Sequence, residues 1–244
     1  MSTIVRWTWA KNVMVAVACT AVSFGALITT QSKSKDSMVS KDAQALHTRA
    51  REAGENGNYA EALTLLTQAA ALAPEWPYPV YDRAFTRLLM NDFDGALLDY
   101  ETTLKMSPKG FFTAHVAVDT LRREQAGEFP PGFYLAYTMV EHMDEAQRRE
   151  VLAQLVDKVP GFAPAWLDYA NLATTPAERL RRIERGLAAK PDAQTHGMLK
   201  LNQALVLQHS GQSPAAELIL KDLASDTTST SVVAAWAKVY LTKK

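Results

Sequence analysis

The chain has 244 residues, with 26 Lys and Arg residues against 26 Asp and Glu residues, so its formal net charge is zero. This balance provides no overall field that would attract nucleic acid, and we expect no nucleic-acid partner. The single cysteine, Cys19, excludes an intrachain disulfide and a redox or metal-binding pair of cysteines.

Residues 1–30 are predicted to form a transmembrane anchor or a signal peptide. Residues 13–28 are uncharged and mostly apolar, and Trp7 and Trp9 precede them. A helix that spans a bilayer needs roughly 17 to 25 such residues, and tryptophan is common at the membrane interface. Small residues at 19–21 and 23–25 would also suit signal-peptide cleavage. We favour an uncleaved anchor over a cleaved signal peptide or a buried helix, because the apolar stretch is long for a signal peptide.

The expected location is the inner membrane of a bacterium, with a single membrane pass and the rest of the chain in the periplasm. Lys and Arg residues flank the apolar segment on both sides, so their distribution does not decide the orientation. The alternative is secretion to the periplasm after signal cleavage. Residues 31–41 are polar and rich in serine, which predicts a linker.

Two segments with the same pattern follow, 34 residues apart. Residues 57–63 read Gly-Asn-Tyr-Ala-Glu-Ala-Leu, residues 91–97 read Asn-Asp-Phe-Asp-Gly-Ala-Leu, and Pro74 and Pro108 close the two segments. Each unit reads as a helical hairpin, in which an aromatic residue fills the turn, a small residue lets the helices approach, and proline ends the second helix. Because about 34 residues is the tetratricopeptide period, the chain resembles the tetratricopeptide repeat family. The resemblance implies an all-α solenoid, wound as a right-handed superhelix, that serves as a binding scaffold.

The predicted repeat domain covers residues 42–225 and contains no strand. Its predicted parts are clear repeats at 42–75 and 76–108, an irregular stretch at 109–160, and degenerate repeats at 161–191 and 192–225, followed by a C-terminal capping helix within 226–244. In the irregular stretch we expect three helices, at 111–126, 133–143 and 144–159, where two repeats would supply four. Asp42 and Asp144 are predicted N-terminal caps of their helices.

In the tetratricopeptide family, ligands lie in a concave groove lined by the first helix of each hairpin. Projecting that face onto this chain predicts a partner-binding groove made of Gln44, His47, Thr48, Arg51, Tyr78, Tyr81, Asp82 and Phe85. Aromatic residues on such a face can anchor a peptide or a helix, whereas packing between hairpins is their alternative role. The carboxylate clamp of some family members uses Lys, Asn and Arg at fixed groove positions, where this chain has His47, Arg51, Asp82 and Phe85. The match fails, so we do not expect binding of a chaperone tail.

Motifs of catalysis or of cofactor binding are absent from the sequence, and we expect neither enzyme activity nor a cofactor nor a metal. His115 and Asp119 have a spacing compatible with a metal, but a metal site needs three or four ligands. Asp144 and Glu145, beside His142, suit a helix N-terminus better than acid–base chemistry. Arg179, Arg181, Arg182 and Arg185 read as a solvated helix face with a Glu178 to Arg182 ion pair, or as a docking patch for an acidic partner.

The expected function is that of a membrane-tethered scaffold that binds a protein or peptide in the groove, in bacterial envelope assembly or maturation. An exported periplasmic adaptor is the alternative of the same class. A different class is an enzyme or regulatory subunit with a site within residues 115–145, where the repeat pattern breaks. Self-association through the ends or convex faces of the solenoid is a further expectation to test.

Overall fold

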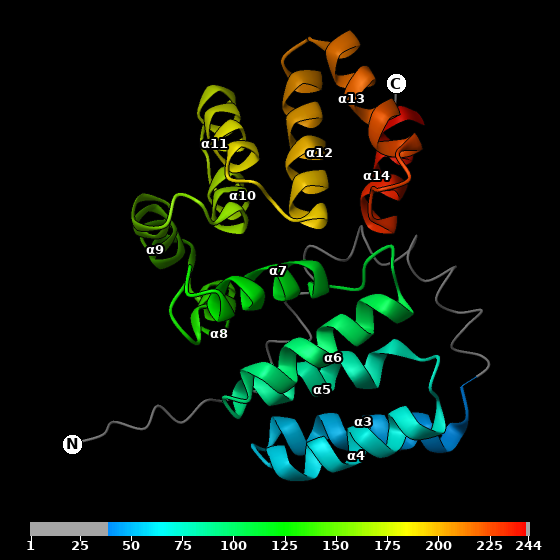
Figure 1. The fold of residues 1–244 in the computed structure, drawn as a ribbon. Helices are drawn as coiled ribbons and strands as arrows, with labels where there is room; N and C mark the ends of the chain where they lie inside the picture. The colour runs from blue at the N-terminus through cyan, green and yellow to red at the C-terminus, as the bar shows by residue number, and fades with distance from the viewer. Residues whose placement is uncertain (1–38, 243–244) are drawn as a thin grey trace. The chain divides into compact units, whose positions relative to one another are not determined.

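The computed structural model describes residues 39–242, and the regular secondary structure of this part is all helical. Twelve α-helices, α3 to α14, and one short 3-10 helix, η1, follow one another without a strand in this range (Figure 1). The predicted all-α fold is therefore confirmed. The predicted anchor or signal peptide and most of the predicted linker lie outside the described residues. None of the helices within 39–242 combines the length and the apolar character that crossing a bilayer requires.

The chain divides into two compact units between Met106 and Ser107. Unit 1, described over residues 39–106, contains α3 (Lys41–Glu55), α4 (Tyr59–Leu72), α5 (Pro77–Leu89) and α6 (Phe93–Met106). Helix α3 packs against α4, α5 against α6, and α4 against α5, so two helical hairpins lie side by side (Figure 1). These are the hairpins that the 34-residue period predicts. The right-handed superhelix concerns both units together and stays a prediction.

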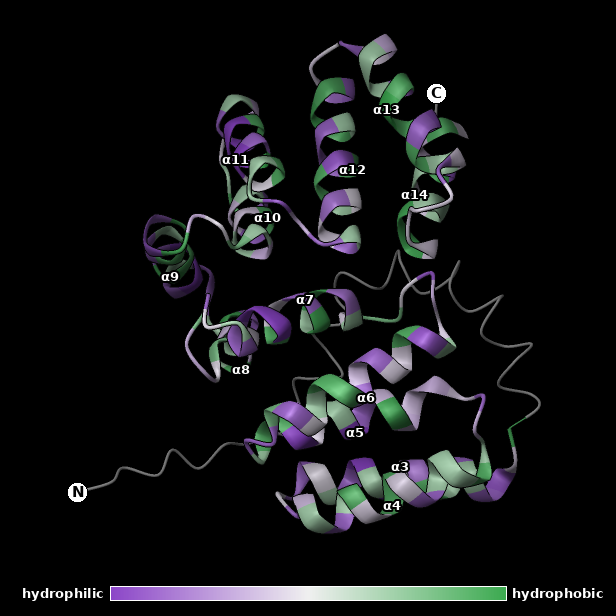
Figure 2. Cartoon of the chain, in the orientation of Figure 1, coloured by the Kyte–Doolittle hydropathy of each residue, from purple (hydrophilic) through white to green (hydrophobic). Residues whose placement is uncertain are grey.

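Small side chains bring the helices of unit 1 together. Ala50, Ala53 and Ala62 are buried with Leu65 and Leu66 in one cluster between α3 and α4. Hydrophobic and hydrophilic residues alternate in bands along the helices (Figure 2), because each helix turns one side to the core and one to solvent. Burial of these apolar faces, at roughly 25 cal/mol per Å² of apolar surface, holds the hairpins together.

The turn that ends α3 recurs at the end of three other helices. Gly57 has φ of 78°, and the N–H of Asn58 donates to the carbonyl of Ala53 at 2.8 Å, which is the hydrogen bond of a Schellman motif. The same bond, at 2.9 Å in each case, ends α5, α7 and α12, after residues with positive φ at positions 91, 127 and 211. The Gly-x-aromatic pattern thus marks a left-handed turn, which is occupied by Asn91 in the second repeat.

Asn91 provides a test of this turn. We expect Asn91→Gly to change the free energy of unfolding by less than about 0.5 kcal/mol and Asn91→Ala to lower it by about 1 kcal/mol. Alanine lacks both the freedom of glycine and the local hydrogen bonding with which asparagine tolerates φ of 60°. Urea denaturation followed by circular dichroism measures both changes. Asn56→Ala, at a residue with φ of −84°, is the control, and an Asn91→Ala variant as stable as the wild type would contradict the assignment.

One predicted helix cap is confirmed and one is wrong. Asp144 precedes α9 and accepts a hydrogen bond from the backbone N–H of Gln147 at 2.9 Å, as predicted. The cap of α3 is Ser40, whose Oγ accepts from the N–H of Ala43 at 3.2 Å. Asp42 lies inside the first turn instead, where its negative charge interacts favourably with the helix dipole.

Unit 2, described over residues 107–242, begins with the irregular stretch. Its helices are α7 (Ala114–Gln125), α8 (Phe133–Thr138), η1 (Met139–His142), α9 (Glu145–Lys158), α10 (Ala163–Asn171), α11 (Pro176–Ala188), α12 (Ala193–His209), α13 (Ser213–Ser225) and α14 (Ser231–Thr242). Helices α10 and α11 form one hairpin and α12 and α13 another, and α14 packs against α12 and α13 (Figure 1). The three helices predicted for the irregular stretch are present, the second of them divided into α8 and η1.

Candidate functional site

The predicted groove residues lie on α3 and α5, the first helices of the two hairpins. His47 is 7% exposed, and its Nε2 lies 2.8 Å from Oδ2 of Asp82. The Nε of Arg51 lies 3.9 Å from the same oxygen, and the Arg51 side chain is 44% exposed. One carboxylate on α5 thus bridges two side chains of α3, so the structure brings His47, Arg51 and Asp82 together.

Aromatic rings surround this polar contact. The ring of His47 meets Trp76 edge-on at 4.9 Å between centroids and Tyr78 at 6.2 Å, and Trp76 lies 5.8 Å from Tyr78. Tyr81 instead packs edge-on against the buried Tyr100 of α6, at 5.5 Å. Tyr78 and Tyr81 are therefore half-buried between neighbouring residues and keep part of their rings at the surface.

The remaining predicted residues are Gln44 and Thr48 on α3 and Phe85 on α5. Gln44 and Thr48 are exposed, and their side chains donate to the backbone oxygens of Val39 and Gln44, at 3.0 Å each. Phe85 is half-buried on α5. The α3–α5 face, as we call the surface formed by the eight predicted residues, therefore combines exposed polar groups with partly exposed rings.

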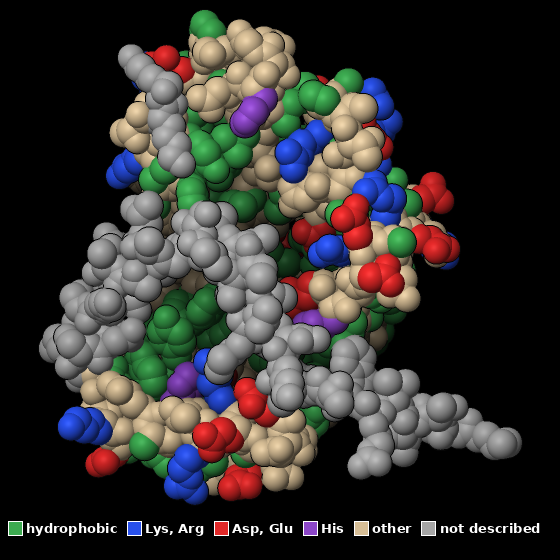
Figure 3. All heavy atoms as spheres, turned by 180° about the vertical axis from the view of Figure 1, so that it is seen from behind, with side chains coloured by type: hydrophobic (Ala, Val, Ile, Leu, Met, Phe, Trp, Pro, Cys, Tyr) green, Lys and Arg blue, Asp and Glu red, His purple; other side chains and the backbone are tan. Residues whose placement is uncertain are grey.

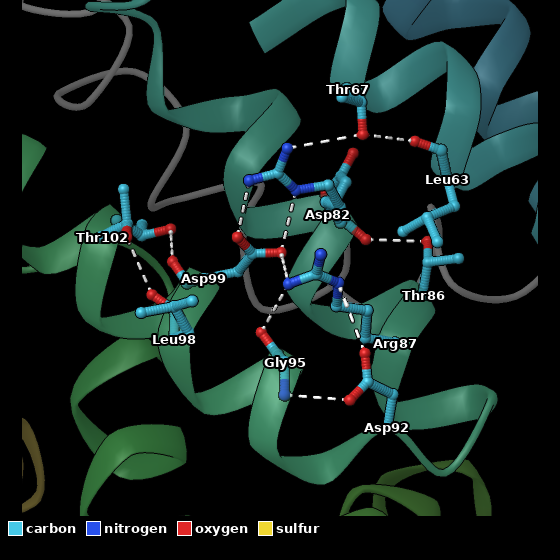
Figure 4. A network of polar contacts seen from close by, with 12 residues as sticks. Leu63, Thr67, Asp82, Thr86, Arg87, Asp92, Gly95, Leu98, Asp99 and Thr102 are labelled. Carbon is cyan, nitrogen blue, oxygen red and sulfur yellow. Dashed lines mark hydrogen bonds and ion pairs between the residues drawn. The ribbon is translucent and has the colours of Figure 1, made fainter.

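The most extensive polar network of unit 1 was not anticipated from the sequence. Asp99 on α6 has a side chain 3% exposed and accepts two hydrogen bonds from Arg83, at 2.6 and 2.9 Å (Figure 4). Nη1 of Arg87 lies 3.0 Å from Oδ2 of Asp99 and also donates to the carbonyl of Gly95 at 2.9 Å. Two guanidinium groups of α5 thus converge on one buried carboxylate of α6.

Two further contacts extend this network. Nε of Arg87 lies 3.6 Å from Asp92, and Arg83 reaches the hydroxyl of Thr67 on α4 at 3.4 Å (Figure 4). The network therefore fixes both helices of the second hairpin and touches the first. The sequence did contain a signal for this network. Arg83 and Arg87 are four residues apart on one predicted helix, and Asp99 lies in the middle of the next. We assign the network to stability, since its charges are paired with one another.

A surface hollow of about 570 Å³ lies at the turn end of the hairpins in unit 1. Residues 57–61 and Met90 line it. Glu61 is the one carboxylate among these lining residues, and the others are Gly57, Asn58, Tyr59, Ala60 and Met90. The hollow offers no set of converging polar groups of the kind that fixes a small ligand.

The alternative site, within residues 115–145, contains two groups with shifted pKa values, His115 and Asp119. Burial lowers the pKa of His115, while the charge of Asp192 opposes this change. Burial raises the pKa of Asp119, against the opposing charge of Arg123, whose Nη1 is 3.7 Å away. His142 lies 3.6 Å from Glu141. Across residues 39–242, no three His, Cys, Asp or Glu side chains are arranged to hold a metal ion.

The arginines of α11 divide into two kinds. Arg182 is 9% exposed, stacks 3.4 Å from the ring centre of Tyr169, donates to the Tyr169 carbonyl and pairs with Glu178. Arg179 donates to the carbonyl of Ala170 at 3.2 Å. These two arginines add hydrogen bonds to the carbonyls of Tyr169 and Ala170 in the last turn of α10, which also accept from the N–H groups of Leu172 and Ala173. The solvated face is therefore wrong for Arg182, while the predicted Glu178 to Arg182 pair is confirmed.

Charges of both signs are interspersed on the surface. Arg181 and Arg185 of α11 are exposed, and the exposed Glu184 lies between them. The face drawn in Figure 3 likewise shows Lys and Arg side chains beside Asp and Glu side chains. Among the residues drawn in colour on that face, side chains of the two signs lie next to each other.

Comparisons with known proteins were made for the sequence and for the structure. No protein-family model matches the chain, and no curated protein sequence matches it. The chain is similar to several solved structures. One is MamA from Desulfovibrio magneticus RS-1, from residue 41 to its end, which is 13% identical to this chain. The match covers 75% of this chain and 94% of that chain, with a TM-score of 0.35. A MamA RS-1 double mutant follows at 12% identity, with 84% and 99% covered and a TM-score of 0.35.

A third similar structure is TTC0263, a thermophilic TPR protein from Thermus thermophilus. It is 16% identical, with 82% of this chain and 98% of that chain covered and a TM-score of 0.35. At these identities and TM-scores, the three likenesses carry no conclusion about this chain. The chain is a protein of helical hairpins, a description that rests on its own helices, turns and period.

Proposed function

We propose that this chain is a tetratricopeptide-like scaffold that binds a protein or peptide partner through the α3–α5 face and catalyses no reaction. The observation that supports this most is the meeting of side chains from two hairpins on one face, where His47 and Asp82 join at 2.8 Å. This contact holds the two first helices in a fixed relation. A surface made by rigid helices presents its side chains at reproducible distances, as recognition requires.

The chemistry of the face favours a partner with apolar side chains. The carboxylate of Asp82 is already shared by His47 and Arg51, and the guanidinium groups of Arg83 and Arg87 bind Asp99. What the face adds for a partner is the exposed part of its aromatic rings. Rings of this kind anchor the apolar side of a helix or an extended segment.

The proposed location is the periplasmic side of a bacterial inner membrane, with residues 13–28 as the anchor and a role in envelope assembly or maturation. Export to the periplasm after signal cleavage is the alternative. The intact mass of the protein isolated from cells separates the two. A chain that begins at Met1 supports the anchor, and a chain that begins near Val22 or Ala26 supports export.

Site-specific photocrosslinking tests the binding face. We expect a photoreactive phenylalanine analogue at Thr48, on the α3–α5 face, to crosslink one stoichiometric partner in cells that produce the full-length protein. The same analogue at Gln68, which is also exposed but lies on α4, should not crosslink that partner. Purification from gently solubilised membranes and mass spectrometry identify the products. Crosslinks from Gln68 alone, or from neither position, would overturn the assignment of the face.

A second candidate function is supported by the shifted pKa values of His115 and Asp119, because such shifts occur at catalytic sites. It assigns an enzyme or regulatory site to residues 115–145. His115→Ala, His142→Ala and Glu145→Ala test it, since unchanged cellular activity in all three variants would end this assignment. Self-association stays a prediction. If residues 32–244 have the mass of a monomer in solution at every protein concentration, self-association is excluded.

A further inference from the structure

The short helix α8 and the adjoining η1 are held in place by groups from distant parts of unit 2. Helix α8 has six residues and η1 has four, too few to be stable without packing. The buried carboxylate of Glu124 accepts hydrogen bonds from the N–H groups of Gly132 and Tyr134, both at 2.7 Å. This carboxylate fixes the start of α8.

Aromatic packing holds the middle of α8. Phe162, which is fully buried, meets Phe133 at 4.9 Å, Tyr137 at 4.7 Å and Phe129 at 5.6 Å between ring centroids, in edge-on contacts. Phe129 also stacks on Phe133 at 4.6 Å. We call these four residues the aromatic cluster. Phe133 and Tyr137 belong to α8, and while α8 stays in place the rings of Phe129 and Phe162 are buried.

A hydrogen bond ties the end of α8 to α10. The hydroxyl of Tyr137 donates to Oδ2 of Asp168 at 2.5 Å. The titratable and charged groups that act on this pair are Tyr134 of α8, Glu141 of η1 and Arg148 of α9. Nε of Arg148 is buried without a hydrogen-bond partner in the described part of the chain. From α11, Arg182 covers the ring of Tyr169, the neighbour of Asp168.

Burial is the main influence on this carboxyl. Burial raises the pKa of Asp168 from 3.8 to about 6, and Glu141 acts in the same direction, while the Tyr137 hydrogen bond and Arg148 oppose the rise. Burial and the charge of Asp168 raise the pKa of Tyr137 well above its usual value, so Tyr137 remains a donor. Between pH 4 and 6 the folded chain therefore holds a proton that the unfolded chain has released. The resulting stabilisation is present at low pH and is lost as the pH rises through about 6.

We propose that Tyr137 and Asp168 form a proton-dependent latch, which holds α8 and η1 against Phe129 and Phe162 while Asp168 is neutral and lets this segment open more readily once Asp168 is ionised. Ionisation strengthens the hydrogen bond from Tyr137, but it also places a charge in a buried position near Glu141. Burial is the larger effect, so the neutral carboxyl is favoured. The latch thus makes exposure of an apolar surface depend on pH, independently of any partner at the α3–α5 face.

Hydrogen exchange of the full-length chain between pH 4.5 and 7.5 tests the latch. We expect the protection factors of amides in residues 133–142, corrected for the intrinsic rate at each pH, to fall by roughly thirtyfold as the pH rises. That factor follows from a pKa of about 6 in the folded chain against 3.8 in the opened one, because at pH 4.5 Asp168 is protonated in the folded form and already mostly ionised in the opened form. In Asp168→Asn the protection should not vary with pH. Asp157→Asn, an exposed carboxylate on α9, is the matched control and should behave like the wild type.

Flat protection in the wild-type protein, or the same fall in Asp168→Asn, would overturn the latch. A ¹³C NMR titration of the Asp168 carboxyl group gives an answer even if the variant does not fold. A midpoint near 6 in the wild type supports the latch, and a midpoint near 4 overturns it. Tyr137→Phe should move the midpoint upward, because it removes the donor that favours the ionised form.

Discussion

Asp99→Asn should lower the free energy of unfolding of unit 1 by about 3–5 kcal/mol. The substitution removes the negative charge that Arg83 and Arg87 share at 2.6–3.0 Å and leaves two cations beside a side chain that is 3% exposed. An uncompensated buried charge is costly, because the interior solvates it poorly. Urea denaturation gives the overall change, and hydrogen exchange in α5 and α6 places it in the second hairpin.

Two variants complete this test. Asp94→Asn removes a carboxylate from an exposed position of the same helix and should change the free energy of unfolding by less than about 0.5 kcal/mol. The triple variant Asp99→Leu, Arg83→Met and Arg87→Met should recover much of the lost stability. Apolar groups of similar size often stabilise a protein as much as the buried ion network that they replace. Asp99→Asn as stable as the wild type would show that the network contributes nothing.

Phe162→Ala should lower the free energy of unfolding of unit 2 by about 3–5 kcal/mol. The ring is fully buried and contacts Phe129, Phe133 and Tyr137, so its removal leaves a cavity among side chains that pack around it. Because α8 depends on this packing, its amides should lose protection before those of α12. Hydrogen exchange and chemical denaturation measure the two effects.

The control for Phe162→Ala is an exposed leucine of the same unit. Leu218 on α13 is 71% exposed, and Leu218→Ala should change the free energy of unfolding by less than about 0.5 kcal/mol. Phe162→Leu should fall between the two variants, since it keeps an apolar side chain but loses the edge-on ring contacts. Equal effects of Phe162→Ala and Leu218→Ala would contradict the central role of the aromatic cluster.

Most of the local structure was predictable from the sequence, because local interactions determine it. The Gly-x-aromatic pattern marks the left-handed turns that end α3 and α7, and the 34-residue period places the same turn at Asn91. Asp144 was identified as a cap and Glu178 as the ion-pair partner of Arg182, since both interactions span three or four residues of one helix. The eight predicted groove residues also lie where they were predicted, on the first helices of two hairpins. The helix to which a residue belongs is determined by the local pattern around it.

The interactions that distinguish this chain depend on which faces of its helices meet. His47 and Asp82 are 35 residues apart, Tyr137 and Asp168 are 31 apart, and Arg83 and Asp99 are 16 apart. No spacing within one helix reveals such pairs. Their burial, and with it the raised pKa of Asp168, depends on the packing of whole hairpins around them.

Even a cap shows this division. Ser40 and Asp42 are both good capping residues, and the chain entering α3 places the serine at the helix start. Composition, turn chemistry and period thus determine that the chain forms helical hairpins, because each of these acts over a few residues. Which charges are buried, paired or shifted in pKa is determined by tertiary packing, because the free energy of a charge depends on the atoms around it in space.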